Sequence, residues 1–114
     1  QRVVEPELLL QPRHLNNASK LHGGVSATLL DVAMGLCGTW TEQADQRRVA
    51  TTLSMNVNFS APAPAGSRIR AVACCRSSGH KVFMASCDLL DEQDRLLAFG
   101  EGVYQRGKLR SELP

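Results

Sequence analysis

The chain has 114 residues, of which 43% are hydrophobic and 21% are charged, a composition typical of one soluble globular domain. Its net charge is only +2, its 13 Lys and Arg residues are scattered and 4% of its residues are aromatic, which argues against a surface for nucleic acid. No apolar run approaches the ~18 residues needed to span a bilayer. We therefore expect a single domain over residues 1–114, located in the cytoplasm, with neither nucleic acid nor a membrane as a partner.

In chain order, the first predicted element is a short strand between Pro6 and Pro12. The second is a long helix from Val25 to Trp40, because apolar residues recur there at the 3.6-residue spacing of an α-helix. The apolar stripe is so wide that little polar face remains, which predicts a buried helix. Asp31 nevertheless stands in the middle of this pattern, and a carboxylate in such surroundings needs a partner or a chemical role.

Four strands are predicted after the helix. From Val49 to Phe59 apolar and polar residues alternate with a period of two, which predicts a strand with one face on the core. The stretch APAPAG (Ala61–Gly66) ends this strand, and the polar tail after Gly107 is the one candidate for disorder. Three further strands are expected at Arg68–Arg76, Lys81–Leu90 and Leu96–Gln105.

The order of these elements, one strand, a long helix and four strands joined largely by short turns, predicts an α+β fold. We expect an antiparallel β-sheet wrapped around one central helix. A domain this small leaves sheet edges uncovered, and a second copy of the chain is the natural means of covering them. We therefore expect at least a homodimer.

Neither the four cysteines nor the three histidines form a metal-binding pattern. There is no Cys-x-x-Cys pair, and His14, His22 and His80 lie far apart in the sequence. We interpret the cysteines as small buried side chains in a reducing compartment, and we expect no metal site. Nothing near Cys37 in the sequence would lower the pKa of its thiol, so a structural role is favoured over a nucleophilic one.

The segment LHGG (Leu21–Gly24) directly precedes the helix pattern. A helix start exposes unpaired backbone N–H groups, and Gly23 and Gly24 let a ligand oxygen approach them closely, so these groups can polarise a carbonyl toward attack. Asp31 follows eight residues after Gly23, about 12 Å along the helix axis, which is too far for both to serve one carbonyl from the same helix. A two-fold dimer resolves this conflict if Gly23 of one subunit faces Asp31 of the other.

Five features carry a resemblance to a known family: Asn16, LHGG at Leu21–Gly24, Asp31, TTLSMNVNF at Thr51–Phe59 and APAPAG at Ala61–Gly66. In this order they resemble the hotdog-fold thioesterases, specifically the phenylacetate-pathway (PaaI-like) acyl-CoA thioesterase family, over about residues 16–104. The resemblance implies a hotdog fold and hydrolysis of an aryl- or acyl-CoA thioester to free acid and coenzyme A. It implies no metal or redox cofactor, since coenzyme A is part of the substrate. It also implies a homodimer with shared active sites; we expect a homotetramer, and the choice between dimer and tetramer stays open.

The resemblance also implies roles for five catalytic residues. Asp31 would act as a general base for water or as a nucleophile forming a transient anhydride, and the family favours the water route. The N–H of Gly23 would polarise the thioester carbonyl, and Asn16 would hold the attacking water or the thioester. Thr52 would assist the carboxylate, although the connection from helix to strand is slightly longer here. A histidine invites a catalytic interpretation because the residue type titrates near neutrality, but we expect the ring of His22 to fix the loop and the Asn16 side chain through hydrogen bonds.

For the rest of the substrate, the resemblance places pantetheine and nucleotide along Phe59–Pro64 and the turn SSGHKV (Ser77–Val82). The predicted substrate contacts are Gly24, Phe59, Pro62, Arg76, Ser77, Ser78, Gly79, His80, Lys81 and Val82. Gly79 permits a tight turn and the neighbouring cations offer charge to phosphates, whereas the alternative is a plain hairpin turn with a solvated lysine. Arg106 and Lys108 could reach the same phosphates across a dimer. Apolar side chains expected at the acyl group are Leu30, Met34, Met55 and Val57.

Two alternatives stay open. A hotdog hydratase or dehydratase would need a paired histidine and carboxylate in the cleft, whereas His22 stands before the helix. A non-catalytic acyl-CoA-binding protein would keep the fold without turnover, because a fold does not imply an activity. The acyl group itself is open among phenylacetyl, hydroxybenzoyl and medium-chain groups.

Overall fold

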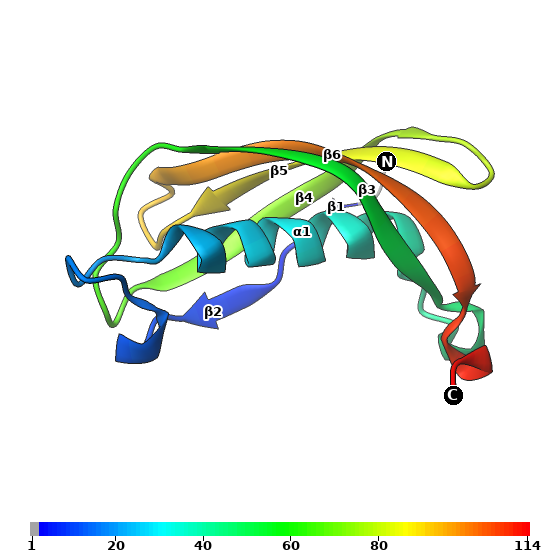
Figure 1. The fold of residues 1–114 in the computed structure, drawn as a ribbon, viewed down its shortest axis with the longest axis horizontal. Coiled ribbons are helices and arrows are strands. Elements are labelled where there is room, and N and C mark those ends of the chain that lie inside the picture. Colours follow the sequence, from blue (N-terminus) through cyan, green and yellow to red (C-terminus); the bar gives the residue numbers. More distant parts are fainter. Residues whose placement is uncertain (1–2) are drawn as a thin grey trace.

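The computed structural model describes residues 3–114, in which one long helix lies across a curved six-stranded antiparallel sheet (Figure 1). The helix is α1 (Gly23–Thr39). The strands are β1 (Val3–Val4), β2 (Glu7–Leu9), β3 (Arg48–Phe59), β4 (Arg68–Ser78), β5 (Val82–Leu90) and β6 (Leu96–Leu109). Three 3₁₀ turns, η1 (Pro12–His14), η2 (Ala44–Gln46) and η3 (Arg110–Glu112), complete the described elements. This confirms the predicted α+β fold with a sheet wrapped around one helix.

The strand order is β1-β4-β5-β6-β3, with β2 also pairing with β4, and every pair is antiparallel. Short turns join β4 to β5 and β5 to β6, so these three strands are neighbours in sequence and in space. β3 instead pairs with β6, the last strand, through the register Thr52 to Tyr104 and Phe59 to Ala98. β3 is therefore an edge strand with one side open.

The core lies between α1 and the inner face of the sheet. Leu30 and Met34 of the helix are fully buried, as are Phe83 of β5 and Tyr104 of β6, whose rings stack at 5.4 Å between centroids. Gly38 permits this packing, because a Cβ at that position would lie 2.3 Å from the Phe83 ring. These contacts fix the height of α1 above the sheet and therefore the position of its polar side chains.

The prediction that β3 places one face on the core is only partly correct, because Val57 packs against the core but most of that face does not. Leu53, Met55 and Phe59 are 51%, 37% and 62% exposed. The physical reason is that α1 covers only part of β3, where Thr52 contacts Asp31 and Val57 packs on the core, and that a bulge between Thr52 and Ser54 interrupts the alternation. The alternation in the sequence therefore does not correspond to burial within this chain.

Differences at the element ends are small, except at the C-terminus. α1 starts at Gly23 and ends at Thr39, where the Trp40 N–H donates to Leu36 O at 2.8 Å. The tail predicted to be disordered instead continues β6 to Leu109 and forms η3, and the Arg110 N–H donates to Arg47 O at 2.8 Å. Within residues 3–114 no helix has the length and apolar character needed to cross a membrane.

Candidate active site

Asp31 lies on the side of α1 that faces β3 and β6, where it accepts two hydrogen bonds. The Thr52 hydroxyl and the Tyr104 hydroxyl both donate to its Oδ1, each at 2.8 Å. Its Oδ2 accepts no hydrogen bond from any residue in the described range 3–114. One carboxylate oxygen is thus held by the fold, and the other is left to a water or a ligand. The structure brings together Asp31 and Thr52, two of the predicted catalytic residues.

Tyr104 is the residue of this group that the sequence analysis did not identify. It is 1% exposed, and burial, together with the hydrogen bond to Asp31, raises the pKa of its phenol above the ordinary value of 10.0. The phenol therefore stays protonated and donates to the carboxylate throughout the physiological range. The only sequence signal for it was its place in the alternation of β6, 73 positions from Asp31.

At the start of α1, His22 caps the helix. Its Nδ1 accepts a hydrogen bond from the Gly24 N–H at 2.8 Å, so that N–H is occupied. The Gly23 N–H, by contrast, donates to no acceptor in the described part of the chain, and the Phe59 ring lies beside it, 3.4 Å from where a Gly23 Cβ would be. Of the two glycines predicted to polarise a carbonyl, the geometry leaves Gly23 as the available donor.

Asn16 lies in the loop before α1, and its side chain stabilises that loop by hydrogen bonds. Its Oδ1 accepts from the Ala18 and Lys20 N–H groups at 2.9 and 3.2 Å. No hydrogen bond joins it to His22 among the described residues, so the predicted contact between these two side chains is wrong. The His22 backbone N–H instead donates to His14 O at 2.9 Å. His22 therefore fixes the loop, as expected, but through the cap and its backbone.

The structure therefore separates the predicted catalytic residues into two groups within one chain. Asn16, His22 and Gly23 lie at the N-terminal end of α1, whereas Asp31 and Thr52 lie about two helical turns further on. Within one chain these two groups of residues do not meet.

A cavity of about 210 Å³ adjoins Asp31. It is lined by Asp31, Val32, Gly35, Leu36, Thr39, Ala50, Thr52, Tyr104 and Arg110. Leu30 and Met34, predicted to contact the acyl group, are instead fully buried in the core between α1 and the sheet. The apolar wall beside Asp31 comes from Val32 and Leu36.

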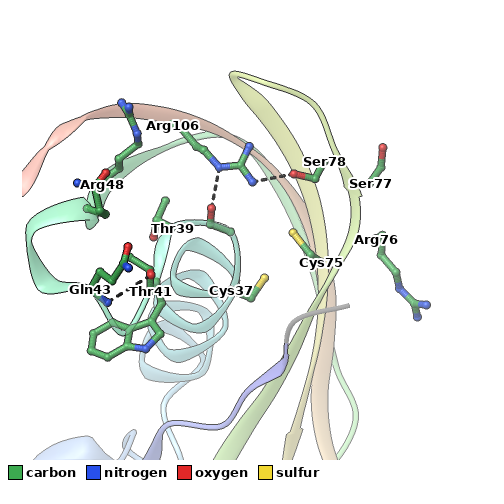
Figure 2. Close-up of a pocket in the computed structure, with 13 residues that line it drawn as sticks. Cys37, Thr39, Thr41, Gln43, Arg48, Cys75, Arg76, Ser77, Ser78 and Arg106 are labelled. Atoms are coloured by element: carbon green, nitrogen blue, oxygen red, sulfur yellow. Dashed lines mark hydrogen bonds between the residues drawn. The ribbon is translucent and has the colours of Figure 1, made fainter.

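The β4–β5 hairpin, predicted to bind the nucleotide, lies beyond the C-terminal end of α1. Arg76, Ser77 and Ser78 line a cavity of about 940 Å³ there, together with Arg48 and Arg106 (Figure 2). His80, Lys81 and Val82 are exposed at and just after the tip of the hairpin. Arg76 donates through Nε to Ser86 Oγ at 2.8 Å.

Arg106 is not the free phosphate ligand that the sequence suggested. Its guanidinium donates to Gly38 O at 2.7 Å, to Gly79 O at 2.8 Å and to Ser78 Oγ at 2.7 Å, and it stacks on Phe83. Arg106 therefore ties the last turn of α1 to the hairpin (Figure 2).

The two segments predicted to contact coenzyme A lie at opposite ends of the molecule, whose longest extent is 41 Å. The residues 59–64 follow β3 at the N-terminal end of α1, and the hairpin lies at the other end (Figure 1). Within one chain they cannot contact the same part of a ligand.

Within residues 3–114 no three potential metal ligands among His, Cys, Asp and Glu come together, and no disulfide joins the four cysteines.

Comparison with known proteins relates this geometry to a family. The family model described as "Thioesterase superfamily" matches residues 19–98. The chain is 30% identical over 102 residues to mouse acyl-coenzyme A thioesterase 13, covering 89% of this chain and 71% of that protein. It is 27% identical over 104 residues to a putative esterase of Pseudomonas aeruginosa, covering 91% of this chain and 75% of that protein.

Solved structures of thioesterase-related proteins superpose on this chain. Zebrafish thioesterase superfamily member 2 superposes with a TM-score of 0.80 at 25% identity, over 93% of this chain and 75% of that one. The PaaI protein from the phenylacetic acid degradation operon of E. coli has a TM-score of 0.80 at 21% identity, over 93% of this chain and 73% of that one. At 21% identity the second likeness is one of fold.

Proposed function

The chain belongs to the thioesterase superfamily and is a thioester hydrolase, and from this premise we propose that it cleaves acyl-CoA thioesters to a free acid and coenzyme A. The observation that carries the proposal is Asp31, a carboxylate held through one oxygen by two hydroxyls, with its other oxygen accepting no hydrogen bond from residues 3–114. The relative that is 30% identical is an acyl-coenzyme A thioesterase by name, which supports coenzyme A as the thiol.

In the proposed reaction, Asp31 acts through Oδ2. That oxygen takes a proton from water, the water oxygen attacks the thioester carbon, and the thiolate of coenzyme A leaves. Thr52 and Tyr104 keep the carboxylate oriented by holding Oδ1. The same Oδ2 can instead attack the carbonyl and form a transient anhydride. Single-turnover hydrolysis in ¹⁸O-water separates these routes, because only the anhydride route transfers solvent oxygen to Asp31.

The oxyanion donor comes from a second subunit in this proposal. β3 has an open edge, and a two-fold axis would pair two copies of it in antiparallel fashion. Phe59 lies four residues to one side of Met55 and Thr52 three residues to the other, so pairing centred near Met55 sets Phe59 of one subunit beside Thr52 of its partner. Gly23, which adjoins Phe59, then faces the partner's Asp31. A donor of this kind contributes about 2.7–4 kcal/mol to acyl transfer.

The same pairing supports the proposed coenzyme A site. Residues 59–64 of one subunit approach the α1 C-terminal end and the hairpin of the other, so the two separated segments can act on one ligand. Lys81, exposed near the tip of the hairpin, supplies positive charge there, and the cavity of about 940 Å³ has room for a nucleotide. The acyl group would occupy the smaller cavity beside Asp31, against Val32 and Leu36.

The first test is thiol release from a panel of aryl- and straight-chain acyl-CoA esters by the wild type and Asp31→Asn. The variant amide can keep both hydrogen bonds at Oδ1 and replaces only Oδ2, so the fold should survive while turnover falls at least ~100-fold. Asp88→Asn is the matched control, because Asp88 is an exposed aspartate of β5. Near-normal turnover of Asp31→Asn would remove Asp31 as the base, and no hydrolysis by folded wild type would overturn the proposal.

The shared site has a separate test. Gly23→Pro removes the Gly23 N–H, and proline is favoured at the first helical position. The preceding residue, His22, already has the extended backbone that proline requires, with φ −69° and ψ 134°. Mixed and refolded, the inactive Gly23→Pro and Asp31→Asn chains should recover about a quarter of wild-type activity, since half the dimers are mixed and each has one intact site. No recovery from mixed dimers would contradict the shared site.

A further inference from the structure

Two cysteines on different elements meet in the wall of the larger cavity. Cys37 lies in the last turn of α1 and Cys75 in β4, and both line the cavity of about 940 Å³. Cys75 is close enough to be among the groups that raise the pKa of the Cys37 thiol. Figure 2 shows the two sulfurs turned toward the same space between helix and strand. The proposed hydrolysis makes no use of either thiol.

We propose that Cys37 and Cys75 form a dithiol site that reacts with low-molecular-weight disulfides and closes an intrachain disulfide between α1 and β4. The geometry carries this inference, because helix and strand place the two sulfurs in the wall of one cavity and turn them toward the same space, where they can approach to the ~2.05 Å S–S bond length. The cavity gives the external disulfide a route to them. Arg48 and Arg106 on its wall carry positive charge that attracts an anionic disulfide such as glutathione disulfide.

The two thiols differ in access, which assigns the order of steps. Cys37 is 2% exposed and donates to Met34 O at 3.0 Å, and burial raises the pKa of its thiol to about 12. Cys75 is half-buried. Cys75 is therefore the thiol that attacks the external disulfide, and Cys37 is the thiol that resolves the mixed disulfide.

The reaction balances without any further reactant. The Cys75 thiolate attacks one sulfur of glutathione disulfide, forms a mixed disulfide and expels one glutathione thiolate. Cys37 then attacks the Cys75 sulfur and expels the second glutathione, and its proton goes to that departing thiolate. The protein loses two electrons and two protons, and glutathione disulfide becomes two molecules of glutathione.

Cys74 and Cys87 serve as internal controls for the reaction of the Cys37–Cys75 pair. Cys74 adjoins Cys75 in sequence, but its side chain is on the outer face of the sheet, where it contacts Ser86 Oγ at 3.5 Å. Cys87 is buried in β5 and donates to Asp88 O at 3.7 Å. Neither lines the cavity that holds the dithiol pair.

The test treats the reduced full chain with glutathione disulfide under anaerobic conditions, alkylates the remaining thiols after denaturation and maps peptides by mass spectrometry. In the wild type we expect a crosslink between Cys37 and Cys75, two alkylated cysteines and a higher melting temperature than in the reduced protein. Cys74→Ser should crosslink to the same extent, whereas Cys37→Ala should stop at a glutathione adduct on Cys75. Because the buried Cys37 site could lose stability, Cys75→Ser provides a second variant, in which Cys37 should stay unmodified.

A wild-type protein that accumulates the glutathione adduct without the internal crosslink would overturn the proposal. A crosslink that uses Cys74, or is lost in Cys74→Ser, would overturn it as well. These readouts do not depend on hydrolysis, so they stand apart from the proposed function.

Discussion

Removing the hydroxyl of Tyr104 should damage catalysis more than removing that of Thr52, although both donate to the same oxygen of Asp31 at 2.8 Å. Thr52 is exposed, so water can take the place of its hydroxyl in Thr52→Val. Tyr104 is 1% exposed, so its hydroxyl has no such substitute. In Tyr104→Phe the ring still stacks on Phe83, and the change is confined to the donor.

The size of the effect follows from the charge of the acceptor. A hydrogen bond to a charged group contributes about 1.5–3 kcal/mol, equivalent to about a 10- to 150-fold fall in kcat/KM if all of it acts in the transition state. For Thr52→Val, replacement by water leaves about 0.5 kcal/mol, or about a twofold fall. We therefore expect Tyr104→Phe to be the slower enzyme by about a factor of ten.

The assay is thiol release from the best acyl-CoA substrate, with thermal unfolding of each variant as the control for folding. A larger loss in Thr52→Val than in Tyr104→Phe would refute the reasoning from burial. So would Tyr104→Phe within about twofold of the wild type, because the buried hydrogen bond would then not orient the base.

Three further outcomes are expected. Lys81→Ala should raise KM for coenzyme A esters, because an exposed ammonium attracts their phosphates. The effect should be smaller at high salt, which screens this attraction, and an effect on kcat alone would contradict the prediction. Gly38→Ala should lower the melting temperature, because a methyl group 2.3 Å from the Phe83 ring overpacks the core, which destabilises the fold by about 1–3 kcal/mol. The better helix propensity of alanine offsets about 1 kcal/mol of this loss. An unchanged melting temperature would refute the prediction. Burial raises the pKa of Cys37 and Cys87 from 9.0 to about 12, so the folded chain keeps protons that the unfolded chain releases. The free energy of unfolding, measured with urea, should therefore fall as pH rises from 9 toward 12, and a flat curve would argue against it.

The periodicity of the sequence predicted α1 and β3 to β6 to within four residues at each end, because each element has a continuous stripe or face that is apolar. β1 has only two residues and offers no period to detect. For β3 the alternation predicted a covered face, but alternation does not say how much of that face the chain itself covers. The open edge of β3 emerges only from strand order, which depends on contacts distant in sequence.

The candidate site was predictable where a residue broke a local pattern. Asp31 stood out because it interrupts an apolar helix, and Gly23 because it precedes one. Tyr104 did not, since a tyrosine in an alternating strand is most simply a core residue, and only the fold shows its hydroxyl on the carboxylate. Arg106 was misassigned for a similar reason, because its charge is visible in the sequence but its three carbonyl and hydroxyl acceptors are not.

The hydrogen bonds of Arg106 have a thermodynamic consequence for any ligand of the hairpin. A loop that becomes ordered on binding lowers the affinity by about 0.5–1.5 kcal/mol for each side chain that it immobilises. Here Ser78 Oγ and Gly79 O are fixed by Arg106 when the chain folds, so this entropy is lost before a ligand arrives. The hairpin is therefore preorganised before a ligand binds. Because the same guanidinium also holds Gly38 O, the helix that carries Asp31 and the hairpin behave as one rigid unit.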